Sequence, residues 1–209
     1  MSSRDMLFTF ADGKKGADSP LSRWLAQVDL LGPVYDLFLV SLFQPRIFLG
    51  LRFLSLAQAI ESLHSRRFPH YEVPKADHRR RVDEIVAAVP DHYKEWVTDK
   101  LAGANRASFR RGLRELLATV PDDLKAALGD EEAFGKKVHL TRNYLTHYNP
   151  DLADKAAKGV ALQRLAMALK VVLEPLLLLE LGFDRDEVAG LIDRNEPYKM
   201  NVSFAIRDS

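Results

Sequence analysis

The sequence predicts an all-α protein, a helical bundle with short irregular or strand-like ends. Apolar residues recur at intervals of three and four over most of the chain, which is the spacing of amphipathic helices. Asp, Asn or Ser opens most of these segments, in the position that caps a helix. Alternation of apolar and polar residues with a period of two, which is typical of strands, is confined to the two ends of the chain. At 209 residues and 47% hydrophobic content, the chain can bury a core, and one domain is the simpler expectation.

The first predicted helix begins where Ser19 caps the chain and Pro20 takes the first helical position, and a break is expected near Gly32-Pro33. A lead-in is expected over 1–18, the helical domain over 19–195 and a tail over 196–209. The later helices are predicted, in chain order, over 35–42, 45–65, 77–88, 91–101, 105–119, 122–128, 130–148, 151–181 and 184–194.

Charge and composition limit the classes of function that this protein can have. A formal net charge of +1 leaves no global footprint of a nonspecific nucleic-acid binder, so any contact with RNA must be local. The chain has no cysteine, which excludes disulfides and thiol nucleophiles, and the histidines show no metal-ligand spacing, so neither a metal nor a cofactor is expected. The apolar run 171–181 is too short to span a bilayer, and no signal-peptide pattern is seen. We expect a cytoplasmic protein without a membrane partner.

The string from Arg142 to His147 carries the most chemical information. On a helix, Asn143 and His147 are about 40° apart and share a face, while Arg142 points elsewhere and can curl back. Asn149-Pro150 should end this helix, which places His147 in its last turn.

These three residue types can bind and cleave a phosphodiester. Arginine offers a planar fork to two phosphate oxygens, and histidine exchanges a proton near neutral pH. An Arg-x4-His spacing is weak evidence taken alone, because Arg142 can equally be a surface charge and His147 a helix cap.

The segment 136–148, with its Arg-Asn-x3-His core, together with the upstream segment 52–64, resembles the HEPN superfamily and most closely the ApeA-like HEPN branch. The resemblance extends over about 30–182 and implies an all-α bundle that dimerises. With the motif intact it implies a metal-independent endoribonuclease of anti-phage defence. It also implies roles: His147 acts as general base or acid, Arg142 stabilises phosphoryl charge, and Asn143 orients the phosphate or His147. Such domains usually follow a larger N-terminal region, so a regulatory region outside this chain is expected.

Four other residues are candidates for supporting groups or an RNA-binding surface: Glu61, His64, Lys136 and Lys137. Glu61 and His64 lie one turn apart, and Glu61 can either hold the Arg142 guanidinium or lie on an exposed helix edge. For His64 the exposed edge is the favoured interpretation. Lys136 and Lys137 fit a phosphate-binding surface and a solvated helix face equally well. His139, two turns before His147, is interpreted as a packing or surface residue.

The sequence therefore predicts a metal-independent endoribonuclease that binds RNA as a homodimer. A single His147 cannot readily serve both ends of an in-line displacement, and a second copy would supply the other proton transfer. The alternative is a catalytically inactive HEPN dimerisation or nucleotide-binding module of a larger defence protein, since fold does not guarantee chemistry. A purely structural bundle is a third possibility.

Overall fold

The structure is a computed structural model that describes residues 19–44, 46–69 and 71–206. Within these residues it contains no strand, and the predicted all-α class is confirmed. The predicted lead-in, with its strand-like stretch, lies outside the described residues. The elements in chain order are α1 (Pro20–Phe43), α2 (Leu49–Arg67), α3 (Lys75–Ala88), α4 (Asp91–Leu101), α5 (Phe109–Leu117), α6 (Asp122–Ala127), α7 (Glu131–His147), the 3₁₀ turn η3 (Pro150–Leu152), α8 (Gly159–Glu180), α9 (Arg185–Asp193) and α10 (Glu196–Ile206).

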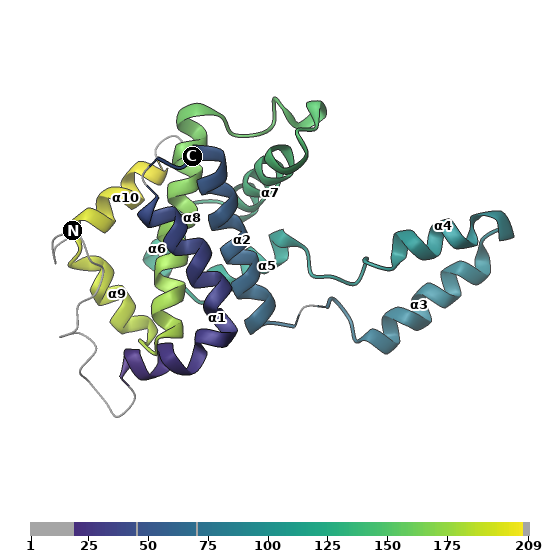
Figure 1. The fold of residues 1–209 in the computed structure, drawn as a ribbon, viewed down its shortest axis with the longest axis horizontal. Coiled ribbons are helices and arrows are strands. Elements are labelled where there is room, and N and C mark those ends of the chain that lie inside the picture. The colour runs from purple at the N-terminus through teal and green to yellow at the C-terminus, as the bar shows by residue number, and fades with distance from the viewer. Residues whose placement is uncertain (1–18, 45, 70, 207–209) are drawn as a thin grey trace.

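Two central helices, α2 and α8, organise the bundle (Figure 1). Helix α2 packs against α1, α5, α7 and α8, and α8 packs against α9 and α10 as well. The three-four pattern of α2 is buried as its sequence predicts, and the same core includes much of α8: Phe53, Leu56, Ile60, Leu63, Leu169, Val172 and Leu173. Each fully buried side chain of this size contributes about 1.5–3 kcal/mol, so α2 is held firmly where it meets α5 and α7.

Helix α1 does not end at Gly32-Pro33, where the sequence predicted a break. It runs through Pro33, and Figure 1 shows it bending along its course. A proline inside a helix disrupts the backbone hydrogen bonds of the preceding turn. In this turn the Nε of Arg66 donates to the Leu30 carbonyl at 2.7 Å. A side chain from α2 therefore supplies a hydrogen bond to the turn before Pro33, which helps the helix to continue.

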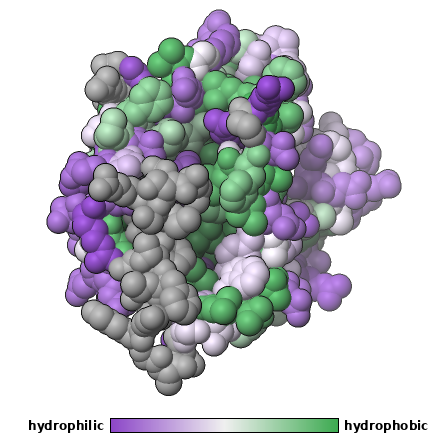
Figure 2. Space-filling view, turned by 60° about the vertical axis from the view of Figure 1, so that its left-hand side comes forward, coloured by the Kyte–Doolittle hydropathy of each residue, from purple (hydrophilic) through white to green (hydrophobic). Residues whose placement is uncertain are grey.

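Among the described helices, α1 alone is long and apolar enough to cross a membrane, and 17% of its most apolar window is buried. Core helices of soluble proteins and signal sequences meet the same criterion. Leu31 and Val34 of α1 are fully buried in the bundle core, while Leu21, Leu25 and Phe43 are exposed. Figure 2 shows one face of the molecule, on which apolar side chains gather between polar ones.

The C-terminal region differs from the predicted tail, because residues 196–206 form α10 against α8. Tyr198 is buried there, its hydroxyl donates to the Val171 carbonyl, and burial raises the pKa of that hydroxyl.

Two predicted helices are shorter in the structure. The predicted helix 151–181 is a 3₁₀ turn, then a loop, then α8 from Gly159, whose φ of 52° is left-handed and therefore favours glycine. The predicted helix 105–119 is the shorter α5, which Ser108 caps by accepting from the Arg111 N–H at 3.3 Å.

Helices α3 and α4 form a hairpin that projects from the bundle (Figure 1). The hairpin has a narrow stem, where the Asn105 side chain accepts from the Val73 N–H at 3.0 Å and donates to the Val73 carbonyl at 2.9 Å. The Glu72 N–H also donates to the Asn105 carbonyl at 2.9 Å. Neither helix contains a buried residue.

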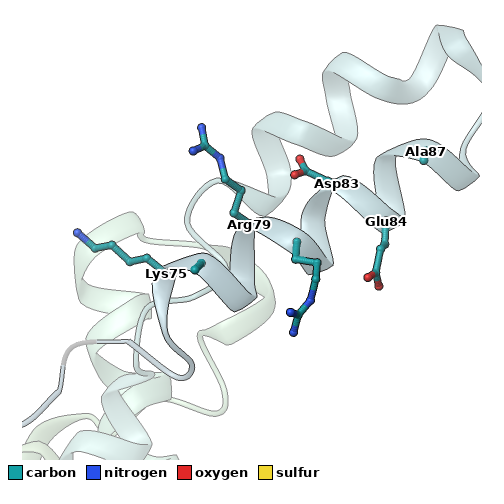
Figure 3. Close-up of a pocket in the computed structure, with 7 residues that line it drawn as sticks. Lys75, Arg79, Asp83, Glu84 and Ala87 are labelled. Atoms are coloured by element: carbon teal, nitrogen blue, oxygen red, sulfur yellow. The ribbon is translucent and has the colours of Figure 1, made fainter.

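An open depression of about 750 Å³ runs along the hairpin, and all of its lining residues belong to α3. Figure 3 shows that Lys75, Arg79 and Glu84 extend from this single helix without converging on a common point. The depression is the open surface of one helix, and it lies away from the motif on α7.

Candidate active site on helix α7

Both ends of helix α7 are defined by capping features. The carboxylate of Asp130 accepts from the backbone N–H groups of Glu132 at 2.8 Å and Ala133 at 3.2 Å, which caps the helix. The helix ends where Tyr148 adopts a left-handed conformation with φ of 48°. The predicted helix 130–148 is thus confirmed to within one residue at each end, and His147 lies in the last turn.

The buried face of α7 fixes how the motif is presented. Val138 and Thr141 are fully buried, and the Thr141 hydroxyl accepts from the Ala157 N–H at 3.0 Å. This contact ties the middle of α7 to the loop before α8. The next two residues, Arg142 and Asn143, therefore have a defined direction at the edge of the core.

Arg142 lies where three helices meet. One of its terminal nitrogens donates to the carboxylate of Glu61 on α2 at 2.7 Å, and its guanidinium carbon lies 5.8 Å from the ring centre of Phe109 on α5. The side chains of Arg142 and Glu61 are 29% and 37% exposed, so the ion pair borders solvent. Glu61 thus holds the guanidinium, and no other hydrogen bond from its N–H groups is found within the described residues.

Asn143 reaches back along the helix and not forward to His147. Its amide nitrogen lies 3.1 Å from Nε2 of His139, one turn earlier. Burial lowers the pKa of His139, and the positive charges of Arg142 and Arg110 lower it further. A neutral imidazole next to the motif arginine was missed by the sequence interpretation, although the spacing of four between His139 and Asn143 was a usable signal.

The imidazole of His147 is exposed and makes no hydrogen bond or ion pair with the residues that the structure describes. Neighbouring aromatic side chains flank this end of α7, since Tyr144 and Tyr148 meet edge to face at 5.7 Å. Arg142 contacts α2 and α5, whereas His147 faces solvent at the helix end. Within a single chain, the Arg142 guanidinium and the His147 imidazole therefore do not contact each other.

His64 is not on an exposed edge, as the sequence interpretation favoured, because α5 covers it. Its Nε2 lies 2.6 Å from the Glu115 carboxylate, and its ring stacks on Phe68 with centres 5.1 Å apart. A Cβ at Gly112 would lie 2.9 Å from this ring, so only glycine allows the close approach. Hydrogen bonds from Arg111, and then from His64, hold the pKa of Glu115 below its usual range. His64 therefore secures α2 to α5.

The remaining predicted groups lie at the periphery. Lys136 and Lys137 are exposed on α7, and the Lys137 ammonium donates to the Lys155 carbonyl at 2.9 Å. A small cavity of about 20 Å³ lies between α2 and α5, lined partly by Glu61, His64 and Phe109. In the described part of the chain, no group of three or more His, Asp or Glu side chains is placed to hold a metal ion.

An all-α bundle that presents an Arg-Asn-x3-His helix against two neighbouring helices defines a HEPN-type domain. Residues 54–187, more than half of the chain, match the family described as Apea-like HEPN, and they include Glu61, His64 and all of α7. The chain belongs to the Apea-like HEPN family. Domains of the HEPN family often have nuclease or defence-related functions. Comparison with curated proteins and comparison with solved structures gave no match.

Proposed function

We propose that the protein is a metal-independent endoribonuclease of the HEPN type that acts in the cytoplasm in anti-phage defence. The observation that carries the proposal is the state of the motif on α7. Glu61 orients the Arg142 guanidinium at the solvent edge, and the His147 imidazole has no competing partner within residues 19–44, 46–69 and 71–206. An oriented cation and an unengaged proton carrier are the two parts that metal-free cleavage of RNA needs.

In the proposed reaction the ribose 2′-oxygen attacks the adjacent phosphorus while His147 takes the hydroxyl proton. The bond from phosphorus to the 5′-oxygen breaks, and a second imidazole donates a proton to that leaving oxygen. Arg142 binds the non-bridging oxygens, on which charge increases in the transition state. The products are a 2′,3′-cyclic phosphate and a free 5′-hydroxyl.

The second imidazole would come from His147 of another copy across a two-fold axis. Support for this arrangement comes from exposed apolar side chains near the C-terminal half of α7. Gly50, at the start of α2, lies against the Leu145 side chain, and the nearby Phe48 and Leu51 are 81% and 52% exposed. Together with the exposed Tyr148, these side chains leave apolar surface on the start of α2 and the end of α7 that a second copy could cover. We therefore propose a symmetric homodimer with a shared cleft.

The alternative function is that of a catalytically inactive HEPN module, which serves for dimerisation or nucleotide binding in a larger defence protein. The separation of Arg142 from His147 within one chain and the near-neutral net charge favour it. Both proposals allow a regulatory N-terminal region outside this chain. They differ in whether RNA is cut.

Cleavage of single-stranded RNA by the purified chain, in the presence of EDTA, tests the proposal. We expect products with 2′,3′-cyclic phosphate ends or their hydrolysis products, and loss of cleavage in His147→Ala. Thr146→Ala is the matched control, because Thr146 is exposed on the same last turn. Cleavage that requires Mg²⁺, or undiminished cleavage by His147→Ala, would show that the proposal is wrong. Binding and dimerisation without cleavage would support the inactive module.

A further inference from the structure

Only the nitrogen of the Asn143 side-chain amide has a hydrogen-bond partner among the described residues. This nitrogen is engaged by His139 at 3.1 Å, whereas the amide oxygen has no hydrogen-bond partner in the described part of the chain. Asn143 is partly exposed and directly follows Arg142, whose guanidinium Glu61 holds at the solvent edge. An unengaged acceptor therefore lies beside the cation proposed to bind phosphate.

The contact with His139 Nε2 determines which atom of the Asn143 amide is free, and the surroundings of the ring bear on its charge. Arg142 on α7 and Arg110 on α5 both act on the imidazole, and Arg110 is itself paired with Glu132. Two positive neighbours and burial disfavour a second proton on the ring, and they lower its pKa. A neutral ring whose Nε2 accepts from the Asn143 amide carries its one proton on Nδ1. That Nδ1 is buried and has no hydrogen-bond partner, so the contact with Asn143 is the one polar contact that orients the ring within the described structure.

We infer that His139 is a positioning residue that turns the Asn143 amide so that its oxygen, not its nitrogen, meets the substrate, where it accepts a hydrogen bond from a ribose hydroxyl. The inference rests on the proposed function and gives Asn143 a narrower role than the sequence does. A carbonyl oxygen repels phosphate oxygens but accepts from a hydroxyl donor. The 2′-hydroxyl is the group that distinguishes RNA from DNA. The attacking 2′-hydroxyl gives its one proton to His147, so the hydroxyl that Asn143 binds belongs to a neighbouring nucleotide. Asn143 then recognises the sugar, and Arg142 recognises the phosphate.

The orientation is tested without any reaction, by nitrogen NMR of the histidine rings in the full chain. We expect His139 to be neutral at pH 7, with its proton on Nδ1, and we expect this signature to change in Asn143→Ala. A proton on Nε2, or a doubly protonated ring at pH 7, would overturn the inference, because the ring would then donate to the amide oxygen.

Binding of the substrate supplies a second test. In a His147→Ala background, which prevents cleavage, single-stranded RNA and DNA of one sequence are compared by fluorescence anisotropy. His139→Leu removes the acceptor and should reduce the preference for RNA by about tenfold, the equivalent of one hydrogen bond. His139→Gln retains an acceptor at similar reach and should restore most of the preference. An unchanged preference in His139→Leu would overturn the inference.

Kinetics separate this inference from the proposed function. If the chain cleaves RNA, His139→Leu should lower kcat/KM by about tenfold, mainly through a higher KM, and His139→Gln should recover it. Equal kcat/KM in wild type and His139→Leu would overturn the positioning role and leave the nuclease assignment intact. If wild type cuts no RNA, the nuclease assignment fails, while the NMR and binding results still decide the orientation of Asn143.

Discussion

The two ends of the motif sequence on α7 differ in how completely the chain supports them. The inner turn, residues 139–143, has partners on two other helices: Glu61 and Phe109 hold Arg142, and His139 holds Asn143. The outer turn, residues 146–148, is exposed, and His147 has no polar partner among the described residues. The fold therefore builds the phosphate-binding half of the proposed site and leaves the proton-transfer half open.

Because of this difference, we expect substitutions at the two ends of the motif to affect stability and activity differently. Changes that remove a packed or paired group of the inner turn should influence both properties. Changes in the outer turn affect solvated groups and should influence activity alone. The proposed dimer would then complete the outer turn, as it adds a second imidazole to the first.

The largest expected effect belongs to His147→Ala. Loss of the proton carrier should lower RNA cleavage by about a thousandfold, within the usual range for general acid-base residues. Because the side chain is exposed and has no polar partner in the part of the chain that the structure describes, the midpoint of thermal unfolding should not move. Cleavage rates and thermal scans on the variant and on Thr146→Ala check both points. A large loss of stability would mean that the outer turn is more tightly packed than the structure shows.

Arg142→Lys should lower cleavage by about a hundredfold, because an ammonium cannot reproduce the fork that binds two phosphate oxygens. Unfolding should change little, since lysine can still pair with Glu61 at a partly exposed position. Arg114→Lys on α5 is the control, as that arginine is exposed. Equal cleavage by the two variants would reduce Arg142 to a general positive charge.

Glu61→Gln tests whether the inner turn is held by charge. The guanidinium would lose its anchor, and we expect about a tenfold loss of cleavage. The free energy of unfolding should fall by less than about 1 kcal/mol, the usual value of a pair that borders solvent. Glu95→Gln on the α3–α4 hairpin removes an exposed carboxylate as a control. Faster cleavage in Glu61→Gln would indicate that Glu61 competes with the phosphate for Arg142.

Subunit mixing tests whether cleavage needs the His147 imidazoles of two chains. Wild type mixed with a threefold excess of His147→Ala, after exchange, leaves about a quarter of the wild-type chains paired with each other. If both imidazoles are needed, activity per wild-type chain should fall about fourfold. Unchanged activity per wild-type chain, or full activity from a monomer in sedimentation, would contradict the shared cleft and leave the fold assignment intact.

The smallest effect concerns acid stability of the inner turn. The folded chain lowers the pKa of His139 below its ordinary value of 6.5, so the unfolded chain binds this proton more readily. The contribution to stability is fully present above that value and is lost as the pH falls through the lowered one. His139→Gln should therefore lose less stability than wild type between neutral and acidic pH in denaturant titrations. An identical pH dependence would mean that the imidazole is solvated in both states.

Much of the fold was predictable because its signals are local. The caps and apolar spacing of α7 predicted its bounds to within one residue, and the spacing of Phe53, Leu56, Ile60 and Leu63 predicted the buried face of α2. The break expected at Pro33 was wrong, because α1 continues through the proline, and one contact of this turn comes from another helix. Arg66, more than thirty residues away, supplies a hydrogen bond to the turn before the proline.

The site was predictable in its motif and less so in its partners. Arg142, Asn143 and His147 stand in one string, and the contact of Glu61 with Arg142 was one of two open interpretations. The burial of His64 could not be predicted, because it depends on Gly112 of α5, which no spacing relates to α2. His139 was interpreted as a packing or surface residue because it lies two turns from His147, whereas its partner is Asn143, one turn away.

The stem closed by Asn105 makes the α3–α4 hairpin a removable module. The chain leaves the bundle after Glu72 and returns at Asn105, and the backbones of these two residues are joined by one hydrogen bond of 2.9 Å. A short linker between them spans almost no distance. The hairpin can therefore be exchanged for another insert while α2 and α5 keep their places, with Glu61 and Phe109 still against Arg142. Such a junction allows the hairpin to be replaced by another segment while the motif helix keeps its contacts.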